Sequence, residues 1–149
     1  MILPDFKDFP RSGRVLGVDW GQRRLGIAVS DPNRNFVFVR PVLQLPTMAQ
    51  NHAQLVAGVA KTESVVAIVV GMPLRADGTE SETTKMVRDF VQQLEQCTDL
   101  PIATIEENLT SVAAQENMGR VRVRDLKEKL DSESARVILE NAIAIINRG

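Results

Sequence analysis

The sequence predicts a single α/β domain in which helices pack against a mixed β-sheet. Early in the chain, short apolar runs separated by tight turns are typical of antiparallel strands. Later, apolar runs alternate with amphipathic helical patterns, which is typical of parallel strands joined by helices. The length of 149 residues fits one domain with a substantial core. We expect this domain to span residues 14–149, after a polar, proline-containing arm over residues 1–13 that we expect to be flexible.

The first half of the chain predicts three strands, a helix and a fourth strand. Apolar runs at 14–20 and 24–30 predict a β-hairpin, and the run at 35–45 contains Pro41, which suits an edge strand. Thr47 is a candidate N-cap for a helix whose apolar stripe we expect at Met48, His52, Leu55, Val56 and Val59. The continuous apolar run at 65–70 predicts a central parallel strand.

The second half predicts a strand at 101–105 between helices. Thr79 and Glu82 form a capping-box pattern ahead of a helix whose inward stripe we expect at Met86, Val87, Phe90, Val91, Leu94 and Cys97. A short helix over 110–118, closed by Gly119, should follow the strand. The last helix, capped by Asp131 or Ser132, should bury Ala135, Ile138, Leu139, Ala142, Ile145 and Ile146.

Composition narrows the class of protein. Hydrophobic residues make up 44% and charged residues 25%, the usual balance of a globular protein. The single cysteine, Cys97, excludes an internal disulfide and a cysteine-based zinc site, so we expect a cytoplasmic location. We expect Cys97 itself to be a small, buried, apolar side chain. No apolar run is long enough to span a membrane. The net charge of -1 means that any nucleic-acid binding must come from local patches.

Three carboxylates are the candidate catalytic and metal-binding residues. Asp19 and Glu107 follow predicted strands, and Asp131 opens a predicted helix, so all three can meet at the carboxyl ends of the strands. Clustered carboxylate oxygens suit Mg²⁺ or Mn²⁺, and such ions support phosphodiester cleavage. Each residue also has a purely structural interpretation: Asp19 as a turn residue, Glu107 as a solvated charge and Asp131 as an N-cap.

The glycines and the basic residues suggest where a nucleic acid would bind. The turn from Gly71 to Gly78 would allow backbone N–H groups to approach a phosphate, although it also reads as a simple strand-to-helix connection. The densest basic stretch comprises Arg120, Arg122, Arg124, Lys127 and Lys129, which either bind the phosphate backbone or form a solvated loop. His52 and Trp20, as isolated residues of their kinds, are interpreted as packing residues.

Two motifs resemble those of the YqgF/RuvX family of RuvC-like nucleases, and the similarity spans Arg14 to Ile146. The pattern D-x-G-x-x-x-x-G is matched at Asp19, Gly21 and Gly26, and the pattern G-x-P-x-x-x-D-G is matched at Gly71, Pro73, Asp77 and Gly78. A third family block, D-E-R-L-[ST]-[ST], is present as residues 106–111, and the last as residues 131–135. Within the third block, Glu106 replaces an Asp and Asn108 replaces an Arg, which removes a bidentate phosphate ligand.

The resemblance implies an RNase H-like fold with strand order 3-2-1-4-5, strand 2 being antiparallel. It also implies a Mg²⁺ or Mn²⁺ site at Asp19, Glu107 and Asp131, and a nuclease that matures the 5′ end of 16S ribosomal RNA. The expected partner is precursor RNA, on its own or on pre-ribosomal particles, and the expected state is a monomer or a weak homodimer.

Three other functions remain open. The family is also associated with Holliday junction resolution, which would make branched DNA the substrate. The missing Arg at position 108 would suit a non-catalytic RNA-binding factor for ribosome assembly. An actin-like ATPase would share the D-x-G hairpin, but it needs two such subdomains and therefore a longer chain.

Overall fold

The computed structural model describes residues 1–21, 24–44, 51–74, 79–106 and 123–148. Residues 123–132 and 148 are described by their backbone alone. Five strands form one sheet: β1 (Val15–Asp19), β2 (Arg24–Ser30), β3 (Val37–Gln44), β4 (Ala67–Met72) and β5 (Ile102–Glu106). Their order is β3-β2-β1-β4-β5. Strand β2 is antiparallel to β1 and β3, whereas β4 pairs in parallel with β1 and β5. The predicted fold class and strand order are confirmed.

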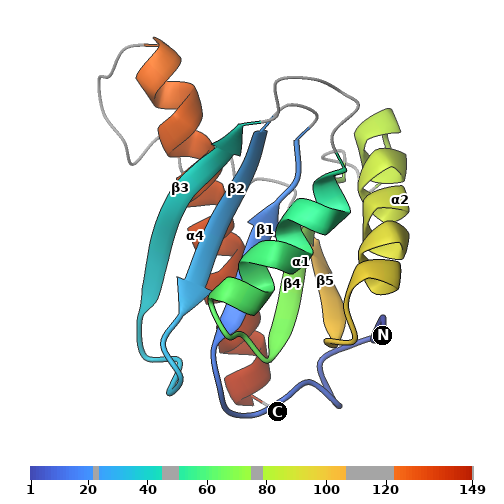
Figure 1. Ribbon diagram of the computed structural model, residues 1–149, viewed down its shortest axis with the longest axis vertical. Coiled ribbons are helices and arrows are strands. Elements are labelled where there is room, and N and C mark those ends of the chain that lie inside the picture. Colours follow the sequence, from blue (N-terminus) through green and yellow to red (C-terminus); the bar gives the residue numbers. More distant parts are fainter. Residues whose placement is uncertain (22–23, 45–50, 75–78, 107–122, 149) are drawn as a thin grey trace.

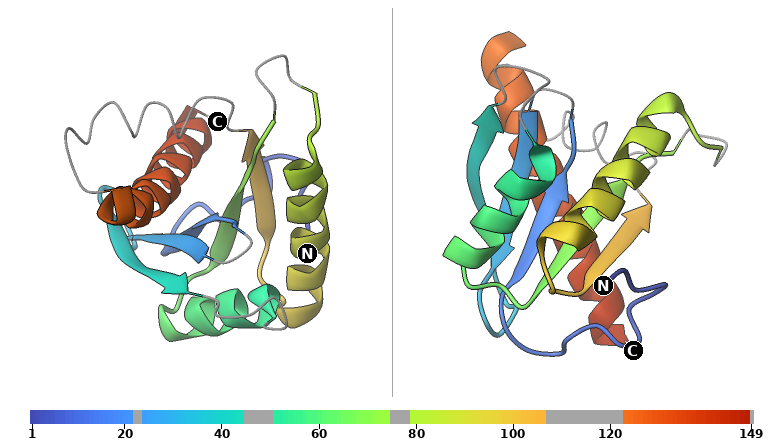
Figure 2. Two further views of the ribbon diagram at one scale, coloured as in Figure 1. Left: turned by 90° about the horizontal axis from the view of Figure 1, so that it is seen from above. Right: turned by 45° about the vertical axis from the view of Figure 1, so that its right-hand side comes forward.

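Three described helices cover the two faces of the sheet. Helices α1 (His52–Thr62) and α2 (Glu82–Cys97) lie on one face, and α4 (Val123–Arg148) crosses the other, as the view from above in Figure 2 shows. Each face has its own core, with Leu16 and Val18 on the α1 and α2 side and Ala28 and Leu139 on the α4 side. In the described part of the chain, no helix is both long and apolar enough to cross a membrane.

The starts of the first two helices differ from the prediction. Helix α1 begins after Asn51, whose side chain accepts a hydrogen bond from the Gln54 amide at 3.1 Å. Helix α2 begins after Ser81, which forms a capping box with Thr84. A cap is therefore set by the residue whose oxygen reaches the N3 amide, and several Ser, Thr and Asn residues near each start compete for that place.

The buried faces of the helices are shifted from the predicted stripes. In α1 the buried residues are Ala53, Val56 and Ala60, because small side chains allow the helix to lie close to the sheet. Leu55 in α1, together with Met86 and Cys97 in α2, is exposed, so the prediction of a buried cysteine was wrong. In α4, Ile143 is buried and Ile145 is exposed.

Helix α4 begins at Val123, so Asp131 is the ninth residue of the helix and neither it nor Ser132 is an N-cap. A long helix needs no new cap at an internal Asp-Ser pair, which explains why the predicted start was wrong. The predicted helix over 110–118 lies outside the described residues.

The first residues pack against the sheet, contrary to the expected flexible arm. Ile2 forms a parallel bridge with Ile102, and the Leu3 amide donates to the Ile102 carbonyl at 2.8 Å. Leu3 and Phe9 are buried in the core on the α4 side. Their apolar side chains, set among polar residues and prolines, help to cover that face of the sheet.

Gly58 offers a test of helix energetics. It lies inside α1, and a Cβ added there would meet no atom within 4 Å. Since glycine is unfavourable in a helix interior, we expect Gly58→Ala to raise the free energy of unfolding by about 0.5–1 kcal/mol. Urea denaturation of the two proteins measures this difference, and a destabilised Gly58→Ala would contradict the open environment of this position.

Candidate active site

Asp19 lies at the carboxyl end of β1, on the face of the sheet that α4 covers. Side chains alternate along a strand, and Val18 packs on the opposite face, with α1 and α2. Two residues before Asp19, a Cβ added at Gly17 would lie 2.9 Å from the Cβ of Leu139 in α4. Gly17 and Asp19 share this face, so the Asp19 carboxylate emerges where α4 crosses the central strand.

Helix α4 carries position 131 toward the same place. The added Cβ of Gly17 would lie 3.1 Å from the carbonyl oxygen of Ala135. Residue 131 precedes Ala135 by four residues, about one turn of helix. In Figure 1 the helix begins beside β3, above the upper edge of the sheet, and β1 ends at this same edge. The backbone therefore brings position 131 toward the end of β1 that holds Asp19.

Strands β4 and β5 end at the same edge as β1. The register pairs Val18 with Val70, so the next residue, Gly71, lies beside Asp19. Gly71 pairs in turn with Ile105 of β5, and Glu106 is the exposed last residue of that strand. Strand β4 thus lies between β1 and β5 at this edge. Because its residue beside Asp19 is Gly71, β4 places no side chain between the ends of β1 and β5.

Only part of the predicted carboxylate cluster falls within the described side chains. Asp19 is placed at the carboxyl edge, Asp131 is placed by its backbone alone, and Glu107 lies outside the described residues. Among the side chains that are described, no group of three or more His, Cys, Asp and Glu is close enough to hold a metal ion. Asp19 carries carboxylate oxygens at this edge, and such oxygens are the ligands that Mg²⁺ and Mn²⁺ prefer.

The predicted glycine turn begins later than expected. Gly71 lies within β4, where it pairs with Ile105, and Gly78 is outside the described residues. After β4, the carbonyl of Pro73 accepts a hydrogen bond from the Thr84 hydroxyl at 2.5 Å, which ties the start of the connection to the first turn of α2. A phosphate-binding role for these glycines stays a prediction.

The β1–β2 turn depends on Gly21. A Cβ at this position would lie 2.6 Å from the Arg24 carbonyl oxygen, so a side chain cannot be accommodated without a shift of the backbone.

Trp20 packs against the core on the α1 and α2 side and stacks on His52, with ring centroids 5.5 Å apart. This packing agrees with the structural role predicted for both residues. The contact between Trp20 and His52 joins distant parts of the chain, so the spacing of residues in the sequence could not predict it.

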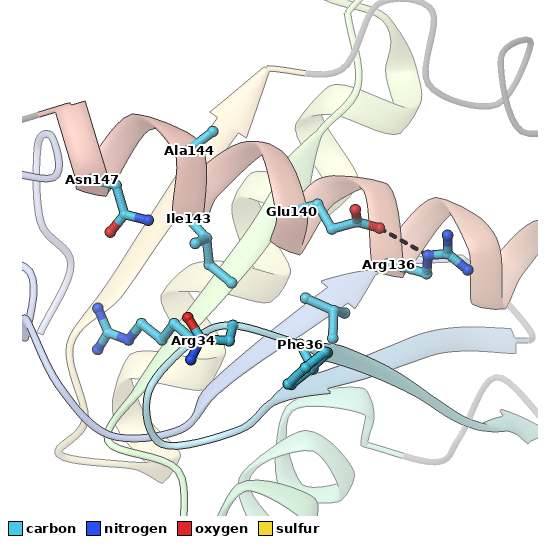
Figure 3. Close-up of a pocket in the computed structure, with 9 residues that line it drawn as sticks. Arg34, Phe36, Arg136, Glu140, Ile143, Ala144 and Asn147 are labelled. Carbon is cyan, nitrogen blue, oxygen red and sulfur yellow. Dashed lines mark hydrogen bonds and ion pairs between the residues drawn. The ribbon is translucent and has the colours of Figure 1, made fainter.

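Several described arginines are already committed to structural contacts. On α4, Arg136 bonds to Glu140 at 2.8 Å (Figure 3). It also lies 3.4 Å from Glu133, and the pKa of Arg136 is raised, mainly by the hydrogen bond to Glu140. Arg40 pairs with Glu63 at 3.1 Å. Each of these arginines therefore lies beside an acidic side chain, which reduces the net positive charge that it offers to a phosphate.

Arg34 is also unsuited to binding a nucleic acid. It is buried, with its Nε donating to the Gly13 carbonyl at 3.0 Å, and burial lowers the pKa of its guanidinium. The cavity of about 440 Å³ that Arg34 lines lies between the start of β3 and the second half of α4 (Figure 3). Because β3 runs parallel to β1, this cavity is at the opposite end of the sheet from Asp19.

The side chains of the predicted basic stretch all lie outside those that the structure describes. Arg120 and Arg122 precede the described part of α4, and Arg124 is the second residue of that helix, described by its backbone alone. Position 124 lies at the same end of α4 as position 131, about two helical turns earlier. Its role in nucleic-acid binding stays a prediction.

Known proteins resemble this chain along most of its length. The family model described as "RuvX: Holliday junction resolvase" matches residues 13–144. A protein of Maridesulfovibrio salexigens named "Putative pre-16S rRNA nuclease" is 38% identical over 133 residues, covering 88% of this chain and 98% of the relative. A protein of the same name from Rhodopirellula baltica is 35% identical over 136 residues, covering 89% and 78%.

A solved structure supports the fold. RuvC of Thermus thermophilus, solved in complex with a Holliday junction substrate, matches with a TM-score of 0.56 and 11% identity over 91% of this chain and 96% of RuvC. RuvC has an RNase H-like fold, so this likeness and the strand order agree with the fold implied by the sequence motifs. The extent of the family match and the identity to curated relatives together establish that the chain belongs to the RuvX family.

Proposed function

We propose that the protein is a divalent-metal-dependent nuclease that cleaves phosphodiester bonds in the precursor of 16S ribosomal RNA, in the cytoplasm, with Asp19, Glu107 and Asp131 as its catalytic carboxylates. The observation that carries this proposal is the position of Asp19 at the carboxyl end of β1, on the face crossed by α4. The relatives named as nucleases of pre-16S rRNA supply the substrate class.

Strand alternation supports Glu107 rather than Glu106 as the second carboxylate. Ala103 and Ile105 of β5 pack in the core on the α4 side, the same side as Asp19. Alternation assigns Glu106, the last residue of β5, to the other side of the sheet, away from Asp19. Gly71 lies between β1 and β5 on the α4 side, and its lack of a side chain leaves space for the two carboxylates to approach one ion.

The three carboxylates would hold Mg²⁺ or Mn²⁺, which supplies charge stabilisation and an activated water for hydrolysis of a phosphodiester. The protein's own contribution is to hold Asp19 on a central strand and position 131 on a packed helix. Rigid elements fix such ligands better than loops do. The close approach of α4 to β1 at Gly17 sets the separation of these two elements.

The basic stretch is the proposed source of RNA affinity, because several described arginines are paired or buried. We expect replacement of Arg120, Arg122 and Arg124 with Ala to weaken RNA binding and to reduce the slope of log affinity against log salt by up to about 2, since each phosphate contact on a single strand contributes about 0.7. Fluorescence anisotropy across a salt series measures this slope. An unchanged slope would remove the stretch from the binding surface.

A cleavage assay tests the proposed function directly. Purified protein is incubated with a labelled 16S precursor containing the 5′ leader and, separately, with a four-way DNA junction, each with Mg²⁺, Mn²⁺ or EDTA. Metal-dependent cleavage of the RNA supports the proposal. Cleavage of the junction alone would assign the protein to DNA resolution, and RNA binding without cleavage of either substrate would make it a non-catalytic assembly factor.

A further inference from the structure

Arg24 begins strand β2 at the edge of the sheet where β1 ends. The two strands are antiparallel, and their register pairs Asp19 with Gly26. Arg24 lies two residues before Gly26, and Figure 1 shows the start of β2 above the end of β1. Because a strand rises about 3.4 Å per residue, Arg24 is displaced by about 7 Å along β2 from the residue beside Asp19. The long side chain of an arginine can span most of this displacement.

The side chain of Arg24 belongs to the α4 side of the sheet, as does that of Asp19. Leu25 and Ile27 both pack in the core with α1 and α2. The irregularity in the β2–β3 pairing adds a residue to β3 and leaves β2 regular, so alternation assigns Arg24 and Gly26 to the α4 side. Gly26 adds no side chain between Asp19 and Arg24. A carboxylate and a guanidinium therefore border the same end of the same face.

Position distinguishes Arg24 from the other arginines whose side chains are described. The others lie on the α1 and α2 side, as do Arg40 and Arg88, or toward the opposite end of the sheet, as do Arg11, Arg14, Arg34 and Arg136. Arg24 is half-buried, so part of its surface is open to solvent. Among the described side chains, it is thus the arginine that shares both the edge and the face of the sheet with Asp19.

We propose that the Arg24 guanidinium binds a non-bridging oxygen of the scissile phosphate, and this assignment rests on the proposed function. Carboxylates at the edge repel an RNA backbone, and a cation on the same face offsets that repulsion. A guanidinium is a planar donor that matches phosphate oxygens. Arginines placed on a reacting phosphate also stabilise the charge that develops in the transition state.

The backbone of Arg24, rather than its side chain, supports the β1–β2 turn. The Arg24 carbonyl oxygen is the atom that a Cβ at Gly21 would meet, at 2.6 Å. In the sheet, the Arg24 backbone is paired with Gln44 at the end of β3. Glutamine is a long, uncharged side chain that leaves both backbone contacts in place. Arg24→Gln should therefore remove the charge and retain the fold, which circular dichroism verifies.

A salt series tests the phosphate contact without cleavage. Fluorescence anisotropy measures the affinity for a labelled single-stranded RNA in EDTA. We expect Arg24→Gln to reduce the slope of log affinity against log salt by about 0.7, the contribution of one phosphate contact on a single strand. Arg24→Lys keeps the charge and should keep the slope. Arg14→Gln makes the same change at a half-buried arginine at the opposite end of the sheet and should also keep it.

Cleavage rates at saturating RNA test whether the contact is with the scissile phosphate. We expect Arg24→Gln to reduce the rate at least about 10-fold, because it removes a donor aimed at developing charge. The rate of Arg24→Lys should lie between that of Arg24→Gln and that of the wild type, since an ammonium keeps the charge and loses the planar arrangement of donors. Arg14→Gln should cut at the wild-type rate.

The outcomes separate this inference from the proposed function. A folded Arg24→Gln with the wild-type salt slope would overturn the inference, and so would an equal loss of slope in Arg14→Gln. A reduced slope with an unchanged cleavage rate would place the contact at another phosphate and overturn it as well. If the wild type binds RNA and does not cut it, the proposed nuclease activity fails, while the slope of Arg24→Gln still decides whether Arg24 binds a phosphate.

Discussion

Asp19→Asn is expected to reduce metal-dependent cleavage of precursor RNA by at least about 100-fold. The substitution keeps the shape of the side chain and removes the negative charge that the proposed metal site requires. Even partners of metal ligands change activity by about 10- to 100-fold when they are replaced, so loss of a direct ligand should exceed that range. Initial cleavage rates under saturating Mg²⁺ or Mn²⁺ measure the effect.

Two controls separate loss of chemistry from loss of fold. Asp99→Asn makes the same change at an exposed carboxylate in the α2–β5 connection and should leave the rate unchanged. The thermal midpoint of Asp19→Asn should differ from that of the wild type by only a few degrees, since the substitution conserves the volume of the side chain. A folded Asp19→Asn that cuts at the wild-type rate would place the catalytic site elsewhere.

Hydrophobic periodicity was sufficient to predict the sheet. The continuous apolar run ending at Val70 became a central parallel strand, and the run containing Pro41 became the edge strand β3. The predicted strand at 24–30 coincides with β2. These patterns are reliable because burial on one or both faces of a strand dictates its side chains directly.

Helix ends and helix faces were harder to predict, because they depend on contacts between distant residues. Several Ser and Thr residues lie near the start of α2, and the one that caps it, Ser81, is selected by its geometry to the Thr84 amide. In α1, Ala53 and Ala60 face the sheet although larger residues such as Leu55 are more hydrophobic. A buried face is chosen by the fit between helix and sheet as well as by hydrophobicity.

The surroundings of the candidate site residues also depend on contacts between distant parts of the chain. The position of Asp19 followed from its place at the end of an apolar run. Asp131 was predicted at a helix start, but α4 begins at Val123, so position 131 lies within the helix, four residues before Ala135. The distance between this part of α4 and β1 is set by the close approach of the helix to Gly17, a long-range contact that local sequence spacing does not reveal.

Gly17→Ala is expected to lower the free energy of unfolding by about 1–3 kcal/mol, and Gly17→Val by the upper end of that range or more. The added Cβ would lie 2.9 Å from the Cβ of Leu139 and 3.1 Å from the carbonyl oxygen of Ala135. Both atoms are fixed to the helix, so α4 itself must move away from β1. Urea denaturation of the purified variants measures the loss.

Gly58→Ala is the matched control, because the same change in a helix with open surroundings should stabilise the protein. Opposite signs at the two glycines would attribute the loss at position 17 to the close approach of α4. A displaced α4 also carries position 131 away from Asp19, so folded Gly17→Ala should cleave RNA more slowly at temperatures well below its thermal midpoint. Full activity in a destabilised Gly17→Ala would mean that the spacing of β1 and α4 sets stability alone, and would remove Asp131 from the proposed metal site.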